Sequence, residues 1–410
     1  MKLSILTLIC SLQYFTLILD ASIKNSNVSF GIDQLEDDKF AILRGKRVGL
    51  ITNQTGVNSS GVKTRSVLFD SEKVNLVALY TPEHGLDGDE IAGKWVPSRM
   101  DKLTGLKAYS LYGASRKPSL NMLKGVDVLV FDIQDVGARC YTYVSTMALC
   151  MEAAGENAIE FIVLDRPNPV GGWIVEGPPM KEEWMSFVGM FPVPFRHGMT
   201  VGEIAKMAVG EKWLKTTPKL KVIRMEGWNR KMSWMDTGLN WIQTSPNIPR
   251  AESCYYYLLS CIPQHVPGLF AGTGTNKPFQ SIGKNNFNGE RLLKNLNSIK
   301  MPGLEFKGYS DSGKSSEGGV KLKITNFKND ELVSSGIRIL KIIFDYIIHT
   351  EQDIFPFDKK PSMNLLYKVY GSDEIGKKQF IKSSIDDILK SWKPHIESFK
   401  SNREKYLLYR

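Results

Sequence analysis

The stretches VDVLVFDIQD (126–135), YVSTMALCMEAAGEN (143–157) and FIVLDRPNP (161–169) decide the fold. Two short apolar runs flank a segment whose apolar residues recur at helical spacing, which is the pattern of a strand–helix–strand unit on a parallel sheet. Both apolar runs end in polar residues. We therefore predict two buried parallel strands that are joined by a helix.

The same alternation extends on both sides of these stretches. It predicts further strands at RVGLITN (47–53), NLVALYTPEH (75–84), LKAYSLYG (106–113) and KLKVIRM (219–225), and a helix at VGEIAKMAVGEKWL (201–214). This is the pattern of an open α/β fold with a mainly parallel sheet. The alternation breaks at SPNIP (245–249), and a second, smaller domain is expected beyond it, with a strand at 319–327, an amphipathic helix at 336–350 and a charged C-terminal helix.

Composition and charge narrow the class of protein. The chain has 410 residues, of which 42% are hydrophobic and 23% charged, so it can bury a large core and is unlike a disordered or fibrous chain. Lys and Arg number 53 against 43 Asp and Glu, a net charge of +10, but the basic residues are scattered along the chain. We predict no nucleic-acid partner, since a moderately basic surface also suits an anionic polymer or an acidic sugar.

The N-terminus has the pattern of an export signal. Lys2 precedes the uncharged run SILTLICSLQYFTLIL (4–19), and small residues follow at Ala21 and Ser22. We predict that residues 1–22 are a signal peptide and that the protein is secreted or extracytoplasmic, with no stable membrane partner. An uncleaved membrane anchor is the alternative.

The cysteines do not form a disulfide framework or a metal site by their spacing. Cys10 lies in the predicted signal peptide, and the four others are Cys140, Cys150, Cys254 and Cys261. Buried free thiols are expected, although Cys254 and Cys261 could close a small loop in a secreted chain.

Polar residues follow the predicted strands, at the edge where an open parallel sheet has its ligand crevice. They are Asn53 and Gln54 after the first strand, Glu83 and His84 after the second, Asp132, Gln134 and Asp135 after the fourth, and Asp165, Arg166 and Asn168 after the fifth. If they share one rim with Arg139, they form a site for a hydroxyl-rich ligand and for acid–base chemistry on it.

Glu83 is the candidate acid for cleavage of a glycosidic bond. That reaction typically needs a carboxylic acid that protonates the leaving oxygen and a carboxylate that acts as base or nucleophile. Glu83 lies between Pro82 and His84, at a tight strand end where partial burial would favour the protonated carboxyl. The alternative is that Glu83 caps a following helix.

The second carboxylate has three candidates, Asp132, Asp135 and Asp165. The structural alternative for each is a buried pairing with Arg139 or Arg166. His84 and His197 could orient a sugar, or they could be hydrogen-bonded structural residues. These alternatives are open at the level of sequence.

Several motifs of other enzyme classes are absent. The sequence has no GxGxxG that opens a helix after the first strand, no GxxxxGK[ST], no GxSxG and no HExxH. The absence of these motifs argues against nucleotide binding, esterase activity and zinc-dependent proteolysis. We predict no cofactor and no metal site.

Longer motifs carry a resemblance to a known family. They are LITNQTG (50–56), TPEHG (81–85), SLYG (110–113), DVLVFDIQDVGARCYTY (127–143), VLDRPNPVGG (163–172), VEGP (175–178), PVPFRHGMTVGEIA (192–205), SPNIP (245–249), GTGTNKPF (272–279) and REKYLLY (403–409). Taken together, they make the chain similar to the NamZ-type exo-β-N-acetylmuramidases, glycoside hydrolase family 171. The match spans nearly the whole chain after the signal peptide.

This resemblance implies a Rossmann-like catalytic domain at 28–250 and a C-terminal auxiliary α/β domain at 251–410. It implies release of β-1,4-linked N-acetylmuramic acid from the non-reducing end of peptidoglycan fragments, with no nucleotide cofactor. The glutamate of the PEHG motif, the residue proposed as catalytic in the family, falls on Glu83. The expected site residues are catalytic Glu83, Asp132 and Asp135, with Asn53, His84, Gln134, Arg139, Tyr141, Asp165, Arg166, Asn168, His197 and Asn247 binding the substrate.

The chain departs from the family pattern at three positions. Asp87 and Thr273 stand where family members usually carry arginine, and His265 stands where a glutamate is common. An anionic substituent is normally held by arginine or by backbone N–H groups. The loss of two arginines therefore removes groups that could hold the lactyl carboxylate. The alternative function is a non-catalytic or drifted protein that binds amino sugars or muropeptides.

Overall fold

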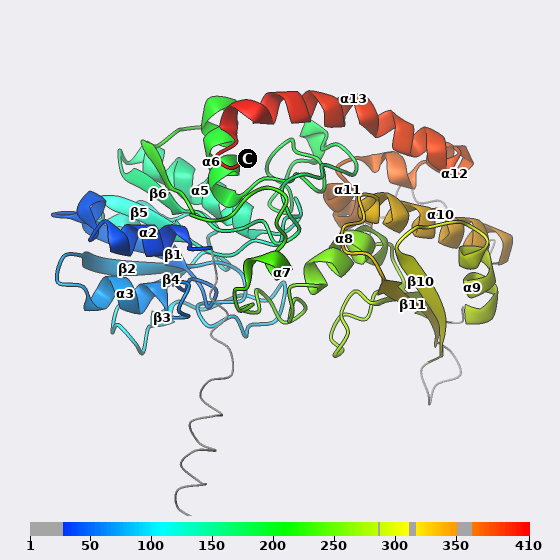
Figure 1. Cartoon of the computed structure of the whole chain (residues 1–410), viewed down its shortest axis with the longest axis horizontal. Helices are drawn as coiled ribbons and strands as arrows, with labels where there is room; N and C mark the ends of the chain where they lie inside the picture. The colour runs from blue at the N-terminus through cyan, green and yellow to red at the C-terminus, as the bar shows by residue number, and fades with distance from the viewer. Residues whose placement is uncertain (1–27, 286–287, 311–316, 351–362) are drawn as a thin grey trace, which may run out of the picture.

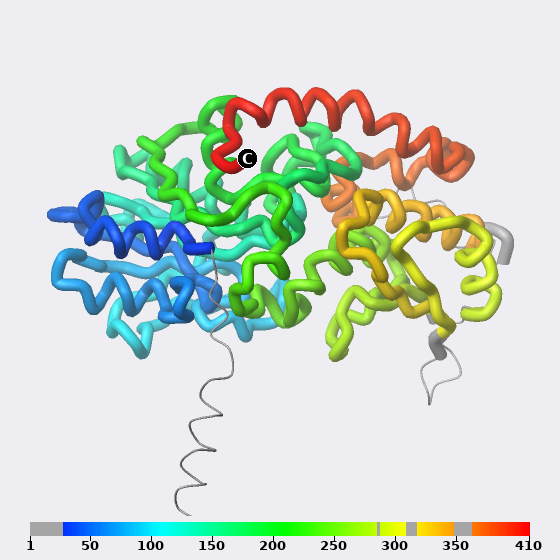
Figure 2. The backbone as a smooth tube through the Cα atoms, viewed as in Figure 1, coloured from blue at the N-terminus to red at the C-terminus, as the bar shows by residue number. Residues whose placement is uncertain are grey.

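The computed structural model describes residues 28–285, 288–310, 317–350 and 363–410. The chain forms two lobes, which lie side by side in Figure 1. The predicted signal peptide lies outside the described residues, so its prediction is untested. Figure 2 follows the backbone from the first lobe through the second and back to the first.

A mainly parallel sheet of seven strands forms the centre of the first lobe, in the order β3-β4-β2-β1-β5-β6-β7. Only β3, which pairs with β4, is antiparallel. The strands are β1 (Arg47–Thr52), β2 (Asn75–Thr81), β3 (Arg99–Met100), β4 (Lys107–Ser110), β5 (Val128–Asp132), β6 (Glu160–Leu164) and β7 (Leu220–Ile223). Without β3, this is the strand order of a Rossmann-like sheet, whose direction of winding reverses between β1 and β5. The predicted fold class and each predicted strand of this sheet are confirmed.

Helices cover both faces of this sheet because its central strands are apolar on both faces. Leu50 and Val130 pack with the helices on one side, and Ile51 and Phe131 belong to the core on the other. The helices of the first lobe are α2 (Gly31–Asp37), α3 (Thr64–Asp70), α4 (Leu120–Leu123), α5 (Tyr143–Glu156), α6 (Val201–Gly210) and α7 (Trp234–Thr237). The predicted helices at 143–157 and 201–214 correspond to α5 and α6.

The second lobe contains an antiparallel sheet in the order β10-β11-β9-β8. Its strands are β8 (Leu269–Phe270), β9 (Ser281–Asn285), β10 (Leu304–Ser310) and β11 (Glu317–Ile324). Val320 and Leu322 of β11 are buried in the core, whereas Lys321 and Lys323 between and beyond them are exposed. One face of this sheet is therefore open to solvent.

Helices fill the rest of the second lobe. They are α8 (Ser253–Gln264), α9 (Gly289–Asn297), α10 (Leu332–Thr350), α11 (Asn364–Tyr370), α12 (Lys378–Lys382) and α13 (Ile385–Arg403). The helix expected at 336–350 is part of α10, and within the described ranges no helix is long and apolar enough to cross a membrane.

The C-terminal segment joins the two lobes. Helix α13 runs above the second lobe and returns the chain to the first, beside α6 (Figure 1). There the Tyr409 hydroxyl donates a hydrogen bond to Asp165 at 2.7 Å, and Leu408 N–H donates one to Glu203 at 2.8 Å. The last residues of the chain thus pack on the sheet of the first lobe.

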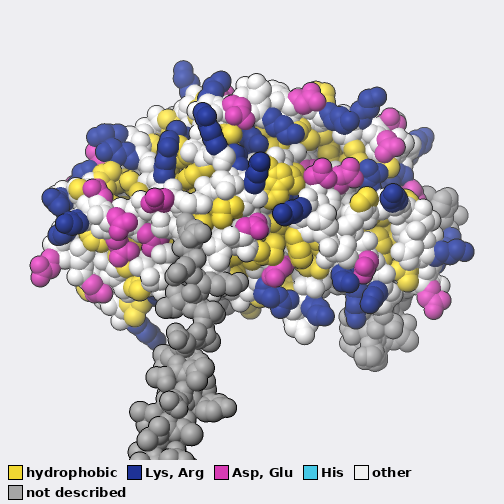
Figure 3. Space-filling view, viewed as in Figure 1, with side chains coloured by type: hydrophobic (Ala, Val, Ile, Leu, Met, Phe, Trp, Pro, Cys, Tyr) yellow, Lys and Arg dark blue, Asp and Glu magenta, His cyan; other side chains and the backbone are white. Residues whose placement is uncertain are grey.

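On the face shown in Figure 3, charged side chains of both signs are interspersed, in keeping with the scattered basic residues in the sequence. In contrast to these surface charges, the ion pair between Asp132 and Arg166 is buried. The Arg166 guanidinium donates to both carboxylate oxygens of Asp132, with nitrogen–oxygen distances of 2.6 and 3.0 Å. Both side chains have almost no exposure, at 2% and 0%. Asp132 also accepts a hydrogen bond from Thr64 at the start of α3, and Arg166 donates one to the Val57 carbonyl.

We predict that Arg166→Met will lower the free energy of unfolding by about 3–5 kcal/mol, because it leaves the buried Asp132 carboxylate unpaired. Addition of Asp132→Asn should restore part of that loss. Chemical denaturation of the three proteins measures the effect. Arg47→Met, at the exposed ion pair with Asp127, is the matched control and should change little. Equal losses at both sites would contradict this prediction.

Candidate active site

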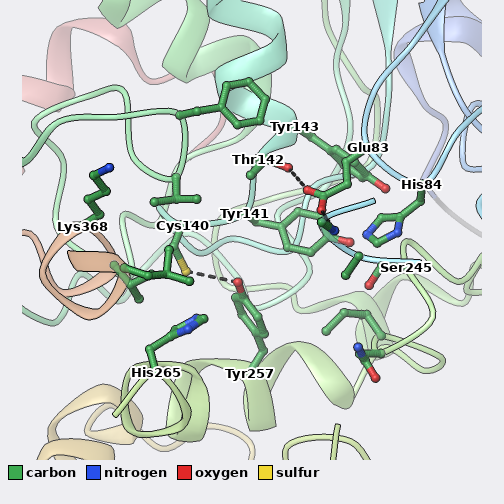
Figure 4. Close-up of a pocket in the computed structure, with 18 of the residues that line it drawn as sticks. Glu83, His84, Cys140, Tyr141, Thr142, Tyr143, Ser245, Tyr257, His265 and Lys368 are labelled. Atoms are coloured by element: carbon green, nitrogen blue, oxygen red, sulfur yellow. Dashed lines mark hydrogen bonds between the residues drawn. The ribbon is translucent and has the colours of Figure 1, made fainter. Parts of the chain in front are cut away.

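A cavity of about 660 Å³ lies between the two lobes. From the first lobe come the loop after β2, the loop before α5 and the segment around Ser245. The second lobe contributes α8, the loop at Thr273 and α11. Figure 4 shows Glu83, Thr142 and Tyr141 across the cavity from Tyr257 of α8 and from His265, which directly follows α8. The size and the mixture of polar and aromatic walls are those of a small-ligand site.

Glu83 reaches this cavity from the carboxyl end of β2, where the sequence placed it. Thr142 Oγ1 donates a hydrogen bond to Glu83 Oε2 at 2.7 Å, and Gly93 N–H donates one to Oε1 at 2.9 Å. The carboxyl is half-buried and has a fixed orientation (Figure 4). Residues 82–98, which are all described, form turns rather than a helix, so Glu83 does not cap a helix here.

His84 and Gly85 turn the chain sharply behind Glu83. Both have left-handed backbone conformations, with φ of 69° and 77°. For histidine this conformation is uncommon and costs energy, and such residues concentrate at functional sites. The His84 ring lines the cavity, and its Nδ1 lies 2.7 Å from the Glu90 carbonyl oxygen. The bend thus presents the Glu83 and His84 side chains to the same cavity.

Tyrosines form much of the wall near Glu83. Burial and the neighbouring Glu83 carboxylate raise the pKa of Tyr112 to about 12. Burial is also the largest influence that raises the pKa values of Tyr141 and Tyr143. All three hydroxyls therefore keep their protons near neutral pH and serve as hydrogen-bonding groups rather than as nucleophiles. The Tyr141 hydroxyl donates to Thr244 Oγ1 at 2.9 Å.

The second lobe supplies the opposite wall. Burial lowers the pKa of His265 to about 4, so this imidazole is neutral at pH 7. Tyr257 and Cys140 meet with an oxygen–sulfur distance of 3.2 Å, and the sulfurs of Cys140 and Cys261 are 3.5 Å apart. The four cysteines of the described chain are buried free thiols, as the sequence predicted, and Cys254 and Cys261 do not close a loop.

Four of the predicted site residues line the cavity: Glu83, His84, Tyr141 and Asn247. The other predicted residues do not line it and are buried and hydrogen-bonded instead, Arg139 to both lobes and the rest within the first lobe. They are Asn53, Asp132, Gln134, Asp135, Arg139, Asp165, Arg166, Asn168 and His197. Their contact with a substrate stays a prediction without support from this geometry.

The three aspartates are buried and accept hydrogen bonds, and Asp132 is paired with an arginine. Asp132 forms the ion pair with Arg166 described above. Asp165 accepts hydrogen bonds from Thr200 and Tyr409, and Asp135 accepts one from Gly137 N–H at 2.8 Å. Each aspartate is at most 5% exposed. The structure thus shows Asp132 in a buried pairing with Arg166, which is the structural alternative that the sequence left open.

Amide side chains and the His197 ring complete these networks. Asn53 Oδ1 accepts hydrogen bonds from Thr55, and Gln134 Nε2 donates to the Pro167 carbonyl. Asn168 Nδ2 donates to the Met199 carbonyl, and His197 Nδ1 accepts from Met199 N–H. These bonds tie the strand ends of the first lobe to one another.

Arg139 connects the two lobes through hydrogen bonds. Its guanidinium donates to the carbonyls of Pro178 and Val193 in the first lobe and to those of Val369 and Tyr370 in the second, at 2.8–3.0 Å. Lys368, which lines the cavity, directly precedes this part of α11. Arg139 therefore positions one wall of the cavity instead of lining it.

Sequence reasoning missed Tyr112, Arg116, Thr142, Tyr257 and Lys368, which all line the cavity. Tyr112 and Thr142 lie inside the motifs SLYG and DIQDVGARCYTY, which could have indicated them. Arg116 lies in a loop, and Tyr257 and Lys368 come from helices of the second lobe, so only the packing of distant segments reveals them.

Asp87 is directed away from the cavity lining. It forms ion pairs with Arg65 at 2.9 Å and with Arg99, and Lys63 lies 3.9 Å from it. Partial burial would raise the pKa of the Asp87 carboxyl, but Arg65 and Arg99 outweigh it and hold that pKa below its usual value. In contrast, His265 and Thr273, the two other departures from the family pattern, do line the cavity.

Comparison with known proteins finds relatives along most of the chain. Residues 48–252 match the N-terminal domain of the family described as exo-beta-N-acetylmuramidase NamZ, and residues 255–409 match its C-terminal domain. A peptidoglycan beta-N-acetylmuramidase NamZ from Bacillus subtilis (strain 168) is 40% identical over 393 residues, which cover 94% of this chain and 92% of that protein.

Two crystal structures of DUF1343 family proteins from Bacteroides fragilis NCTC 9343 have the same fold. One has a TM-score of 0.86 at 39% identity and covers 94% of this chain and all of that one. The other has a TM-score of 0.72 at 30% identity, with coverage of 94% and 99%.

Asp135 offers a test of its buried position. Burial raises the pKa of Asp135 from 3.8 to about 7. Between these values the folded protein holds a proton that the unfolded chain has lost, so this residue's contribution to stability falls as pH rises through that window. We predict that the free energy of unfolding of Asp135→Asn, relative to that of the unmodified protein, increases as the pH rises from 4 to 8, by up to about 4 kcal/mol.

Urea unfolding of both proteins at several pH values measures this difference, in which the other titrating groups cancel. A difference that does not vary with pH would contradict the prediction. We expect Asp135→Asn to keep its hydrolytic activity on small substrates, because Asp135 does not line the cavity. Loss of activity in the folded variant would instead support Asp135 as the second carboxylate.

Proposed function

This chain belongs to the exo-beta-N-acetylmuramidase NamZ family, and from that premise we propose that it releases β-1,4-linked N-acetylmuramic acid from the non-reducing ends of peptidoglycan fragments. It is a glycosidase. The observation that carries this function is the position of Glu83, since the carboxyl predicted from the PEHG motif lies in a cavity large enough for a sugar. The activity of the Bacillus subtilis relative supports turnover over binding alone.

Glu83 is suited to act as acid and base in turn. Among the described residues that line the cavity it is the single carboxylate. In its protonated form it can give its proton to the glycosidic oxygen as the bond between that oxygen and C1 breaks. The carboxylate that remains can then take a proton from the water that attacks C1. Thr142 and Gly93 hold the two carboxyl oxygens in place for both steps.

Two cations in the cavity are suited to the lactyl carboxylate. Arg116 and Lys368 both line it, and neither is ion-paired with a carboxylate of the described chain. The Arg116 guanidinium lies 4.1 Å from the ring centre of Phe187 and 5.1 Å from that of Tyr112, so it is stacked near the Glu83 side of the cavity. Arg116 can therefore supply the guanidinium that the family pattern has at position 273, which also lines the cavity.

We also propose that the protein acts outside the cytoplasm. Its support is the sequence of residues 1–22, with Lys2, an apolar run and small residues at its end. The chemistry agrees, because the proposed substrate is a cell-wall polymer. N-terminal sequencing of the mature protein tests this, and a chain that begins at Met1 would contradict cleavage.

We expect Glu83→Gln to lower kcat on a chromogenic N-acetylmuramide by about 10²–10⁴-fold, because glutamine cannot deliver or take up the proton. Glu90→Gln is the matched control, since Glu90 lies on the same loop but does not line the cavity. Product release measured by absorbance, with circular dichroism as a check on folding, gives the result. A fully active Glu83→Gln protein would overturn the assignment of Glu83.

Arg116→Gln should raise KM for the N-acetylmuramide about tenfold, because it removes a charged hydrogen-bond donor for the lactyl carboxylate. The internal control is an N-acetylglucosaminide with the same chromogenic group, which lacks that carboxylate. Its KM should change little, so the preference between the two substrates should shrink. If both KM values rise equally, Arg116 does not recognise the carboxylate.

A further inference from the structure

Trp95 is an exposed tryptophan on the loop that follows Glu83. Its side chain is 71% exposed, whereas the other seven tryptophans of the chain, which all lie in the described ranges, are buried or half-buried. Tryptophan is highly buried on average in folded proteins. Packing of the protein's own core therefore does not account for the indole at this position.

Hydrogen bonds fix the backbone on both sides of Trp95. Lys94 N–H donates to the Ile91 carbonyl at 3.1 Å, which closes a turn, and Val96 N–H donates to the Tyr112 carbonyl at 2.9 Å. The Val96 side chain is buried beside this second bond. Trp95 is therefore held against the segment that follows β4.

The indole ring of Trp95 lies directly over Gly113 in that segment. A Cβ atom at Gly113 would lie only 2.0 Å from Trp95 Nε1 and 2.3 Å from its Cδ1. The ring approaches the backbone this closely because glycine has no side chain. Part of the ring thus rests on the chain, and most of it is open to solvent. The result is a flat apolar surface whose position is fixed before any ligand binds.

This surface adjoins the Glu83 cavity. Gly93, on the same loop, and Tyr112, on the neighbouring segment, line the cavity, whereas Trp95 does not. Gly93 N–H is also the group that donates to Glu83 Oε1 at 2.9 Å. Since two residues of chain span at most about 7 Å, the backbone of Trp95 lies close to the group that holds the Glu83 carboxyl. The indole is therefore at the rim of the cavity, on the side of Glu83.

The chemistry of the reaction indicates what lies at this rim. The acid that cleaves a glycosidic bond contacts the oxygen between two sugars, so groups beside Glu83 flank both of them. With the terminal sugar inside the cavity, the next sugar leaves it past Glu83. A pyranose ring has a face of C–H groups, and its hydroxyls project around its edge. Such a face can stack on an indole, which buries apolar surface while the hydroxyls stay in water.

We propose that Trp95 is the stacking surface for the sugar on the leaving side of the scissile bond. This rests on the proposed function and adds to it a binding site for the second sugar of the substrate. Trp95 does not touch the reacting atoms. It strengthens the binding of substrates with two or more sugars, and a single N-acetylmuramic acid unit in the cavity does not reach it.

The test is calorimetric binding of two ligands to Glu83→Gln, in which turnover does not interfere. One ligand is the methyl β-glycoside of N-acetylmuramic acid, and the other is the disaccharide N-acetylmuramyl-β-1,4-N-acetylglucosamine. We expect the addition of Trp95→Ala to weaken binding of the disaccharide about tenfold and to leave binding of the single sugar unchanged. Trp95→Phe, which keeps an aromatic face, should retain part of the affinity for the disaccharide.

Leu103→Ala is the matched control. Leu103 is also an exposed apolar side chain, but it lies in the turn between β3 and β4, at the end of β4 opposite to Tyr112. It should leave the binding of both ligands unchanged. Unchanged binding of the disaccharide in Trp95→Ala would overturn the proposal. An equal loss for both ligands would also overturn it, because Trp95 would then act through the loop that holds Glu83.

Gly113→Ala provides a second test that leaves Trp95 in the sequence. Its methyl group would displace the indole, so binding of the disaccharide should weaken, again with little effect on the single sugar. In a protein that already carries Trp95→Ala, the same change should have little further effect, because the ring that it displaces is absent. An equal loss with and without Trp95 would contradict an action of Gly113 through the indole.

These measurements separate the stacking surface from the proposed function. If the unmodified protein fails to hydrolyse both the disaccharide and the chromogenic N-acetylmuramide, the proposed function fails. The calorimetric comparison of the two ligands does not depend on hydrolysis and still decides whether Trp95 binds the second sugar.

Discussion

The buried ion pair between Asp132 and Arg166 is the constraint on which the rest of the structure depends. It lies where the winding of the sheet reverses, and it joins the ends of β5 and β6 to Val57 after β1 and to Thr64 at the start of α3. Because two buried charges tolerate little displacement, this pair fixes the loops that leave these strands. The segment 133–143, which carries Tyr141 and Thr142 to the cavity, starts from that fixed point.

The cavity that Glu83 lines does not lie in the usual ligand crevice of a Rossmann-like sheet. That crevice lies between the ends of β1 and β5, and here Asn53, Gln134 and the ion pair fill it with their own hydrogen bonds. The cavity lies instead beside the end of β2, where Glu83 emerges, and the second lobe closes it. The Glu83 carboxyl thus faces a cavity beside the end of β2, while the polar side chains that follow β1 and β5 are hydrogen-bonded to neighbouring groups.

The basic side chains described above differ in whether a carboxylate of the protein already pairs with them. Around Asp87, three cations are engaged with one carboxylate. In the Glu83 cavity, Arg116 and Lys368 form part of the lining, and neither is ion-paired with a carboxylate of the described chain. A net charge of +10 is therefore less informative than these local arrangements, since exposed charges act over about 10 Å in salt.

The longer sequence motifs indicated the family. Local pattern was enough to predict the strands, the helices α5 and α6 and the position of Glu83 at a strand end, because the periodicity of apolar residues reports burial directly. It singled out Glu83 as the candidate acid but could not decide which of the carboxyls that follow strands faces a cavity. Whether such a carboxyl faces a cavity or a buried partner depends on Arg166, Thr64 and Tyr409, which the chain brings there from other elements. Only the tertiary structure decided that Arg116, Tyr257 and Lys368 join Glu83, since they meet it through the packing of two lobes.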